Sequence, residues 1–344
     1  MTNIETIKKF ATKVLASESI EIGVPLVLEE ITFIPIIKHE IPRDERDYLS
    51  LSEALEEGAC KITDKGTEVA HILFENISEF PILIEEGEIF KGQGTQDRMC
   101  VGTIKVEPMK TVEIPVKCVH APHHLSSGAA FGYGGKAGRG MLKELRSLKF
   151  SHAVNKAPAS TIDQSRVWDQ VHYENVMADV ADNTKYTENV EKRRERAEKI
   201  GKKLKFPTNT VGVVVVNPEG DVKGLEIHRT PHNFKVRKDG ILESIEANIS
   251  WEPEGKGSFK NAQEKVKELF KKISELKKGK EALSQVEISG LAINLDGVSG
   301  EAYTTTFYSG VCPSCNSQKP RQKACPNCGF LEEDMDEIAY MSMY

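Results

Sequence analysis

The sequence predicts an α+β fold with a β-rich first part, a second half that mixes helices with hairpins, and a small cysteine-rich ribbon at the C-terminus. Three observations lead to this prediction. Extended runs rich in Val, Ile, Leu and Phe dominate residues 20–120, helical and strand patterns alternate over residues 161–308, and two Cys-x-x-Cys pairs follow. A chain of 344 residues is long enough to build two or three cores.

The first part opens with a short amphipathic helix, because Ile4, Ile7, Phe10 and Val14 fall at helical spacing. Five extended runs follow, over residues 25–37, 68–77, 81–90, 99–107 and 110–119, with Gly, Pro and Asp between them. Residues 51–58 predict a short helix with Ser52 as its N-cap. We therefore expect residues 1–119 to form a β-rich domain with an N-terminal helix.

The second half predicts helices over residues 165–181, 187–204, 233–249 and 259–276, with a break in the third near Asp239 and Gly240. Two hairpins are expected, one over residues 211–228 and one around Asp296 and Gly297. The apolar stripe of residues 187–204 is narrow, which favours a surface helix or a helix that pairs with a second copy in a homodimer. Residues 161–308 are therefore expected to form an α+β domain.

Charge is segregated along the chain, although the whole protein carries a net charge of −6. Residues 1–100 hold about twice as many acidic as basic side chains, whereas residues 117–156, 183–206 and 256–280 each carry a charge of about +5 to +6. Residues 120–160 are also rich in Gly and His, which predicts a flexible basic loop. Basic segments in an acidic protein are typical of contact with a polyanion, and the simpler alternative is a solvated helix face or a linker.

The cysteines give the sharpest chemical prediction. Cys312, Cys315, Cys325 and Cys328 form two knuckles that together supply a tetrahedral shell of four sulfurs, which suits one structural Zn²⁺. Iron in the same shell and a pair of cytosolic dithiols are the alternatives. We expect a zinc ribbon over residues 309–331 and an acidic tail over residues 332–344. His120, His123 and His124 are compatible with a second metal site or with simple polar contacts.

One dense polar cluster lies in the β-rich part. Glu86 and Glu88 precede a glycine-rich turn, and Gln96 and Arg98 follow it, so a return strand would bring the two pairs together. Such a cluster can bind a small polar ligand or perform acid–base chemistry, and a buried ion-pair network is the alternative.

Several of these residues lie in segments that resemble the ARG and rhodanese-phosphatase-superfamily-associated proteins, a prokaryotic group. The similar segments are residues 51–58 (LSEALEEG), 86–88 (EGE), 96–98 (QDR), 112–116 (VEIPV), 166–168 (RVW) and 211–215 (VGVVV). The family usually has Gln-Asn-Arg where this chain has Gln96-Asp97-Arg98, and it often lacks a zinc ribbon. The resemblance implies a shared fold and a nucleotide or ADP-ribose context, and it supplies no reaction.

Two functions follow as hypotheses. The first is a non-enzymatic zinc-ribbon protein that docks as a regulatory factor on RNA or a ribonucleoprotein, such as a ribosomal subunit, because three basic segments and the ribbon could neutralise phosphates. Its expected contacts are Lys136, Arg139, Lys143, Arg146, Lys149, Arg193, Arg194, Arg321 and Lys323. The second is an enzyme or ligand-binding protein that uses Glu86, Glu88, Gln96 and Arg98 on a nucleotide or ADP-ribose-type metabolite. A protein-only adaptor is a third alternative.

The location of the protein is predicted from what the sequence does not contain. No apolar segment is long enough to span a bilayer, and the N-terminus has no apolar signal core. We therefore expect a cytoplasmic protein that does not enter the membrane.

Overall fold

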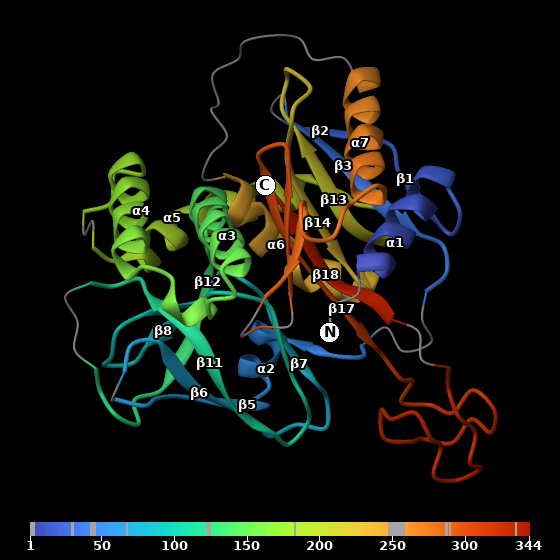
Figure 1. The fold of residues 1–344 in the computed structure, drawn as a ribbon, viewed down its shortest axis with the longest axis horizontal. Helices are drawn as coiled ribbons and strands as arrows, with labels where there is room; N and C mark the ends of the chain where they lie inside the picture. Colours follow the sequence, from blue (N-terminus) through green and yellow to red (C-terminus); the bar gives the residue numbers. More distant parts are fainter. Residues whose placement is uncertain are drawn as a thin grey trace.

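The computed structural model describes residues 4–28, 31–41, 46–66, 68–121, 125–181, 184–246, 259–285, 288, 290–333 and 336–344. Within these residues, three β-sheets and seven α-helices form the mixed α+β architecture that the sequence predicts. Figure 1 shows the large sheet in the upper half of the molecule and the smaller sheets below it.

The large sheet has nine strands and joins both ends of the chain. Its order is β1-β3-β13-β14-β18-β17-β16-β15, with β2 paired to β3, and every pair is antiparallel. The strands are β1 (Ile20–Ile22), β2 (Leu26–Leu28), β3 (Ile31–Lys38), β13 (Thr210–Val216), β14 (Val222–His228), β15 (Ala282–Ser284), β16 (Leu291–Leu295), β17 (Val298–Thr306) and β18 (Asp336–Met343). Because β3 pairs with β13, the expected boundary at residue 119 does not separate two sheets.

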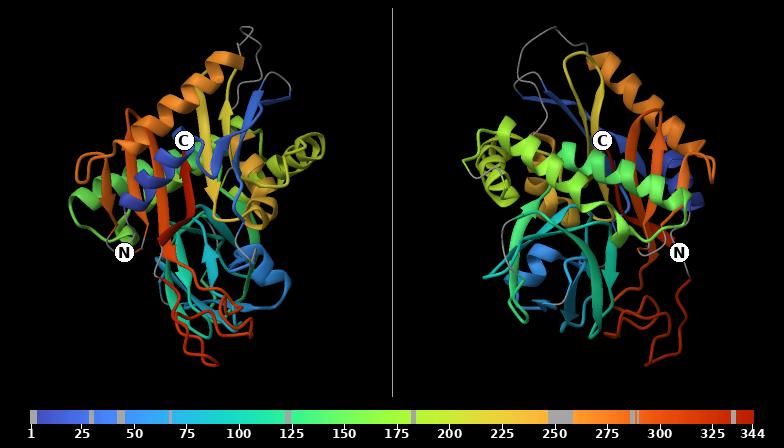
Figure 2. Two further views of the ribbon diagram at one scale, coloured as in Figure 1. Left: turned by 90° about the vertical axis from the view of Figure 1, so that its right-hand side faces the viewer. Right: turned by 60° about the vertical axis from the view of Figure 1, so that its left-hand side comes forward.

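Each face of the large sheet has its own hydrophobic core, and β13 shows why. Val214 and Val216 point to one face, and Val213 and Val215 point to the other, so all four valines are buried. The first face is covered by α1 (Ile4–Ala16) and α7 (Phe259–Ser274), which contribute Ile7, Val14, Val266 and Phe270. Figure 2 shows α7 lying across the strands on this side.

The second face of the sheet is covered by α3 (Arg139–Val154), α4 (Gln164–Met177), α5 (Tyr186–Lys203) and α6 (Pro231–Glu246), which share one core with β8 and β9. Val190 and Ala197 of α5 are buried in this core, so the narrow apolar stripe packs within the chain. The expected break in α6 is absent, since the helix runs through Gly240 without interruption. A single glycine costs a helix about 1 kcal/mol, which the packing of α6 against the sheet offsets.

The two smaller sheets are built from the β-rich first part and from residues 131–136. One has the order β12-β8-β9-β11-β6-β5, and the other has the order β10-β7-β4. Their strands are β4 (Leu49–Ser50), β5 (Cys60–Asp64), β6 (His71–Asn76), β7 (Ile82–Ile84), β8 (Glu88–Gly92), β9 (Arg98–Cys100), β10 (Ile104–Val106), β11 (Thr111–Cys118) and β12 (Phe131–Lys136). Helix α2 (Leu51–Glu56) is capped by Ser50 rather than Ser52, because Ser50 and Glu53 form a reciprocal capping box.

The region expected to be a flexible basic loop is largely regular structure. Residues 131–136 form β12 and residues 139–154 form α3. The glycines that suggested a loop allow β12 to pack closely, since a Cβ at Gly134 would lie 2.8 Å from the side chain of Ile89. Helix α3 forms because Met141, Leu142 and Leu145 make an apolar stripe that is buried.

The expected acidic tail is also corrected. Residues 336–343 form β18, which lies between β14 and β17 in the large sheet. The acidic character ends at Glu337, and the following residues are apolar or uncharged, with Ile338, Ala339, Tyr340 and Met341 buried. No helix among the described residues combines the length and the apolar character that crossing a bilayer requires.

Candidate functional site

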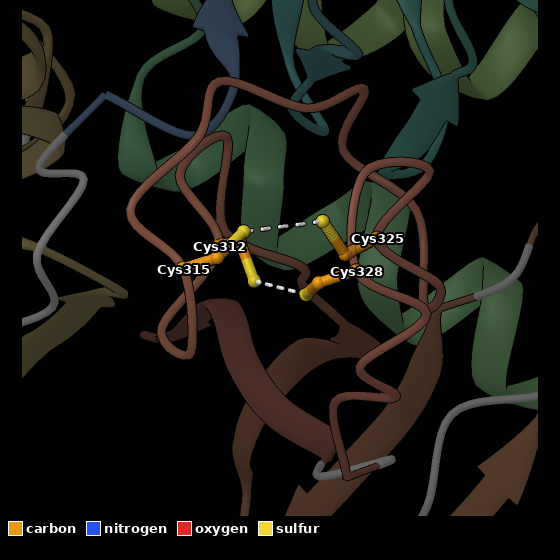
Figure 3. Close-up of side chains that lie close together, drawn as sticks. All are labelled: Cys312, Cys315, Cys325 and Cys328. Atoms are coloured by element: carbon orange, nitrogen blue, oxygen red, sulfur yellow. Dashed lines mark hydrogen bonds between the residues drawn. The ribbon is translucent and has the colours of Figure 1, made fainter.

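The four-cysteine ribbon lies in the connection between β17 and β18. Cys312 Sγ lies 3.6 Å from Cys328 Sγ, and Cys315 Sγ lies 3.8 Å from Cys325 Sγ. A tetrahedral shell with metal–sulfur bonds of about 2.3 Å has sulfur–sulfur separations of about 3.8 Å, so the four thiols fit one metal ion. Figure 3 shows the four side chains pointing toward a common centre. The cluster can therefore hold one metal ion and is consistent with a zinc site.

The two knuckles repeat the same backbone geometry. The N–H of Asn316 donates to Cys312 O, and the N–H of Gly329 donates to Cys325 O, each at 2.9 Å. Asn316 and Gly329 follow the second cysteine of their knuckles, and both have positive φ angles, 56° and 73°. Asn and Gly are the residues that tolerate this conformation best, which explains why they stand at these positions.

The ribbon is attached to the β-rich part of the chain. The guanidinium of Arg321 lies 4.0 Å from the ring centroid of Phe80 and donates to the backbone oxygen of Arg46 at 3.0 Å. Arg46 lies on the same ring, 5.6 Å from its centroid. Arg321, expected to contact nucleic acid, thus fixes the ribbon beside the smaller sheets. Figure 2 shows the ribbon next to these sheets.

The four residues expected to line one ligand pocket are all buried, but Arg98 and Gln96 lie apart from the two glutamates. Glu86 pairs with Arg146 and Lys149, and Glu88 pairs with Arg237. Arg98 lies 3.8 Å from Asp64 and donates to the backbone oxygen of Gln96 at 3.0 Å. The sequence placed Gln96 and Arg98 with the two glutamates, whereas the fold directs Arg98 toward β5.

The largest concentration of buried charge lies between the large sheet, β8, β12 and the helices α3 and α6. We call it the central charge cluster. It contains four cations, five carboxylates and one histidine, all at most 4% exposed, drawn from residues 85 to 301 of the chain. They are Lys136, Arg146, Lys149 and Arg237; Glu85, Glu86, Glu88, Glu226 and Glu301; and His228. Tyr340, Ser342 and Tyr344 complete it from β18 and the C-terminus.

Glu85 and Glu226 are the most strongly paired carboxylates of the central charge cluster. Lys136 Nζ lies 2.9 Å from Glu85 Oε2 and 3.0 Å from Glu226 Oε1, and Arg237 donates to both oxygens of Glu85 at 3.2 and 2.9 Å. Burial acts to raise the pKa of Glu85, but Arg237 and Lys136 hold it well below its usual value. Lys136 likewise lowers the pKa of Glu226 against the effect of burial. Both groups are therefore carboxylates at neutral pH.

Glu88 is different. Burial raises its pKa from the usual 4.5 to about 7, although Arg237 Nη1 lies 2.7 Å from Glu88 Oε1. The neighbouring Glu85 contributes to the rise, because a second negative charge close by disfavours ionisation. Glu88 can therefore gain and lose a proton near neutral pH.

His228 lies between the two paired carboxylates. Its Nδ1 is 3.6 Å from Glu85 Oε1, and its Nε2 is 3.7 Å from Glu226 Oε2. Neither ring nitrogen makes a hydrogen bond within the described part of the chain, although the side chain is 0% exposed. Buried polar groups are nearly always hydrogen-bonded in folded proteins, so an imidazole whose two nitrogens lie just beyond hydrogen-bond distance of two carboxylates is unusual.

The remaining members of the central charge cluster form a second group on α3 and β17. Arg146 Nε donates to Glu86 Oε2 at 2.5 Å, and Lys149 contacts both Glu86 and Glu301. Arg146 also lies over the ring of Tyr344, 4.8 Å from its centroid, and hydrogen-bonds Ser342. The basic residues of α3 therefore neutralise the glutamate that follows β7.

The expected nucleic-acid contacts are distributed over unrelated positions. Lys136, Arg146 and Lys149 belong to the central charge cluster, and Arg193 is buried and donates to Glu243 O at 2.7 Å. These four side chains are inside the fold and do not belong to an exposed cationic surface. Arg194 pairs with the Glu243 carboxylate at 2.9 Å.

The other expected contacts, Arg139 and Lys143 on α3 and Lys323 in the ribbon, belong to two separate elements. Lys143 and Lys323 are exposed, and Arg139 is half-buried. Docking on an RNA-containing assembly remains a prediction. Of the three histidines considered for a second metal, His120 is buried with its Nδ1 4.0 Å from Asp97, while His123 and His124 lie outside the described residues.

Sequence reasoning pointed to the glutamates near residue 86 and to Lys136, Arg146 and Lys149, but it assigned them to different sites. It missed Glu226, His228, Arg237 and Glu301. Glu226 and His228 carried a usable signal, because they alternate with Leu225 and Ile227 in a strand whose two faces are both covered. A polar residue at such a position must find a partner inside the protein. Arg237, Glu301 and the two tyrosines near the C-terminus, Tyr340 and Tyr344, carried no local signal.

A comparison with protein families gives one match, which spans residues 19–302, from β1 into β17. The matching model describes the ARG and Rhodanese-Phosphatase-superfamily-associated Protein domain. The matched range includes every charged member of the central charge cluster and excludes the four cysteines. No curated protein and no solved structure matches the chain. Since the match covers well over half of the sequence, the chain belongs to the family of the ARG and Rhodanese-Phosphatase-superfamily-associated Protein domain.

Proposed function

We propose that the protein is an enzyme that performs acid–base chemistry on a small molecule, with the central charge cluster as its reaction centre. One observation carries the proposal: His228 is fully buried between two carboxylates, and neither of its nitrogens is hydrogen-bonded within the described residues. A substrate could supply the missing partner. Imidazole and carboxyl groups with proton equilibria near neutral pH are the usual general acids and bases of enzymes.

The charge balance of the cluster supports this role. Four cations face five carboxylates, so protonation of one carboxylate brings the net charge of these nine groups to zero. Glu88 is the carboxyl group suited to be neutral, since the pKa of Glu88 is raised to about 7 while those of Glu85 and Glu226 are lowered. Glu88 can therefore exchange a proton while Glu85 and Glu226 stay ionised, a difference between neighbouring carboxyl groups that acid–base catalysis uses.

A purely structural role explains only part of these contacts. An ion-pair network can hold the two halves of the fold together, and Arg146 with Glu86 fits that role. The two nitrogens of His228 lie just beyond hydrogen-bond distance of Glu85 and Glu226, and an unsatisfied buried polar atom costs about 1 to 3 kcal/mol. Strained or costly buried groups concentrate at functional sites, which favours chemistry at His228.

The test is a turnover screen with matched variants. Wild-type protein is incubated with pooled metabolites, and depletion is followed by mass spectrometry. We expect at least one compound to be consumed by the wild type and by Glu195→Gln, whose exposed carboxylate lies on α5, but not by His228→Gln or Glu88→Gln. The proposal fails if the wild type consumes nothing, or if both cluster variants, shown to be folded by circular dichroism, retain wild-type rates.

We also propose that the four-cysteine cluster holds one structural Zn²⁺. The sulfur separations of 3.6 and 3.8 Å suit a closed tetrahedral shell with no open position for substrate. Elemental analysis of protein purified without added metal should give about one zinc per chain, and Cys312→Ser with Cys325→Ser should remove it. Iron in place of zinc, or no bound metal, would contradict the assignment.

A further inference from the structure

A second candidate site lies next to the central charge cluster. It is a groove of about 800 Å³ between the C-terminal end of α5, the segment that follows it and the first turns of α6. Its lining includes four lysines, two on each side. Lys202 lies in the last turn of α5 and Lys205 just after that helix, and Lys235 and Lys238 lie on α6. We call it the lysine groove. Pockets of this volume suit ligands of nucleotide size.

The lysine groove is positively charged in a protein whose net charge is negative. Four lysines face two acids, Glu198 and Asp239, and Lys238 lies 3.8 Å from the Asp239 carboxylate. Lys202, Lys205 and Lys235 are exposed and have no ion pair within the described residues. Three uncommitted ammonium groups around one hollow favour a ligand that carries several negative charges.

The lysine groove also has an apolar floor. Phe206 and Phe234 line it, with their rings 5.3 Å apart in an edge-to-face arrangement. Phe206 is half-buried, so part of its side chain remains accessible to an apolar group of a ligand. Lysines beside an aromatic ring suit a molecule with a phosphorylated end and a flat or apolar end.

Phe234 connects the lysine groove to the central charge cluster. Phe234 is buried at the edge of the groove, among the residues that line it, and its ring centroid lies 6.4 Å from that of His228. Arg237, three residues further along α6, pairs with Glu85 and Glu88 inside the cluster. One helix therefore presents lysines to the groove and an arginine to the cluster, with Phe234 as the partition between them.

We propose that the lysine groove binds the phosphorylated end of a small metabolite, with Lys202, Lys205 and Lys235 holding its phosphoryl oxygens. This inference rests on the proposed function in one respect: the same molecule would place its reacting part toward His228 when Phe234 moves aside. The substrate class that follows is a phosphorylated compound of nucleotide size. Binding itself depends only on the lysines.

The experiment measures binding with two probes, pyrophosphate and ADP, by isothermal titration calorimetry. We expect binding to wild-type protein that weakens as salt rises, since exposed charges are screened. The triple variant Lys202→Gln, Lys205→Gln, Lys235→Gln should weaken both probes by about tenfold or more. The matched control is Lys199→Gln, Lys267→Gln, Lys271→Gln, which removes three exposed lysines outside the groove and should bind as the wild type does.

Two results would overturn the inference: no binding of either probe at millimolar concentration, or equal weakening in the groove and control variants. A third arm uses a single-stranded RNA oligonucleotide. Groove-dependent binding of that RNA without binding of pyrophosphate or ADP would reassign the groove to nucleic acid and also overturn the proposal.

The test separates this inference from the proposed function. Glu88→Gln should leave pyrophosphate binding unchanged, because Glu88 is buried in the cluster and does not line the groove. Lysine-dependent binding without any turnover would support the groove and count against the reaction centre. Turnover that is lost in Glu88→Gln but unaffected by the groove triple variant would support the reaction centre and count against the groove.

Discussion

Replacing Glu88 with glutamine should change how the stability of the protein depends on pH. Glu88 is fully buried, and its pKa is raised from 4.5 to about 7 in the folded protein. Glutamine keeps the shape of a protonated glutamate and cannot ionise. The variant therefore isolates the proton equilibrium of this one side chain from those of Glu85 and Glu226, which both proteins share.

The sign of the effect follows from proton linkage. Between the unfolded and folded pKa values the folded protein holds a proton on Glu88 that the unfolded chain has lost, so stability falls as pH rises through this window. From pH 5 to pH 8 the loss amounts to about 2 to 3 kcal/mol for a folded pKa of about 7. Glu88→Gln lacks this loss. Its unfolding free energy relative to that of the wild type should therefore rise by the same amount between pH 5 and pH 8.

The measurement is guanidinium-induced unfolding of both proteins at several pH values between 5 and 8, with stability taken from the linear dependence on denaturant. The two proteins should differ least at pH 5, where Glu88 is protonated in the fold. A difference in unfolding free energy that stays constant across the range would show that Glu88 titrates normally. A difference of the opposite sign would show that the ion pair with Arg237 dominates over burial.

Three further perturbations have defined outcomes. Chelation of the metal should unfold the ribbon, so residues 309–331 should become sensitive to protease while β17 and β18 stay protected. Cleavage that is unchanged by the chelator would contradict a metal-dependent ribbon. Arg146→Met removes one of the two cations paired with Glu86, with Lys149 as the other, and should cost about 3 kcal/mol by thermal or denaturant unfolding. The double variant with Glu86→Gln should recover part of that loss. Docking on RNA, if it occurs, should fall steeply between low and high salt in a pull-down from lysate, and salt-independent or absent RNA recovery would refute it.

Local pattern was sufficient to predict most secondary structure. The hairpin of β13 and β14 was predicted from one apolar run, a turn and a second run, and the structure confirms it. The four-cysteine ribbon was predicted for the same reason, because both its ligands and its turns are encoded within about twenty residues.

Pairings between distant segments could not be predicted in this way. Nothing in residues 31–38 indicates that their partner is β13, about 180 positions away, and nothing in residues 336–343 indicates a central strand. The composition of residues 120–160 also led to a wrong prediction of a flexible loop, since glycine is common both in flexible loops and in strands that pack closely, as β12 does against Ile89.

The acidic and basic segments of the sequence pair with each other inside the fold, which the composition of each segment does not reveal. Glu85, Glu86 and Glu88 come from the acidic first hundred residues, while Lys136, Arg146 and Lys149 come from the basic segment that follows. The fold places these two groups face to face, at 0 to 2% exposure. An excess of cations in one segment therefore indicates an anionic partner, but that partner can lie in the same chain. Because three of these basic residues are used internally, lysines that remain exposed and unpaired, as in the lysine groove, are the better guide to an external anion.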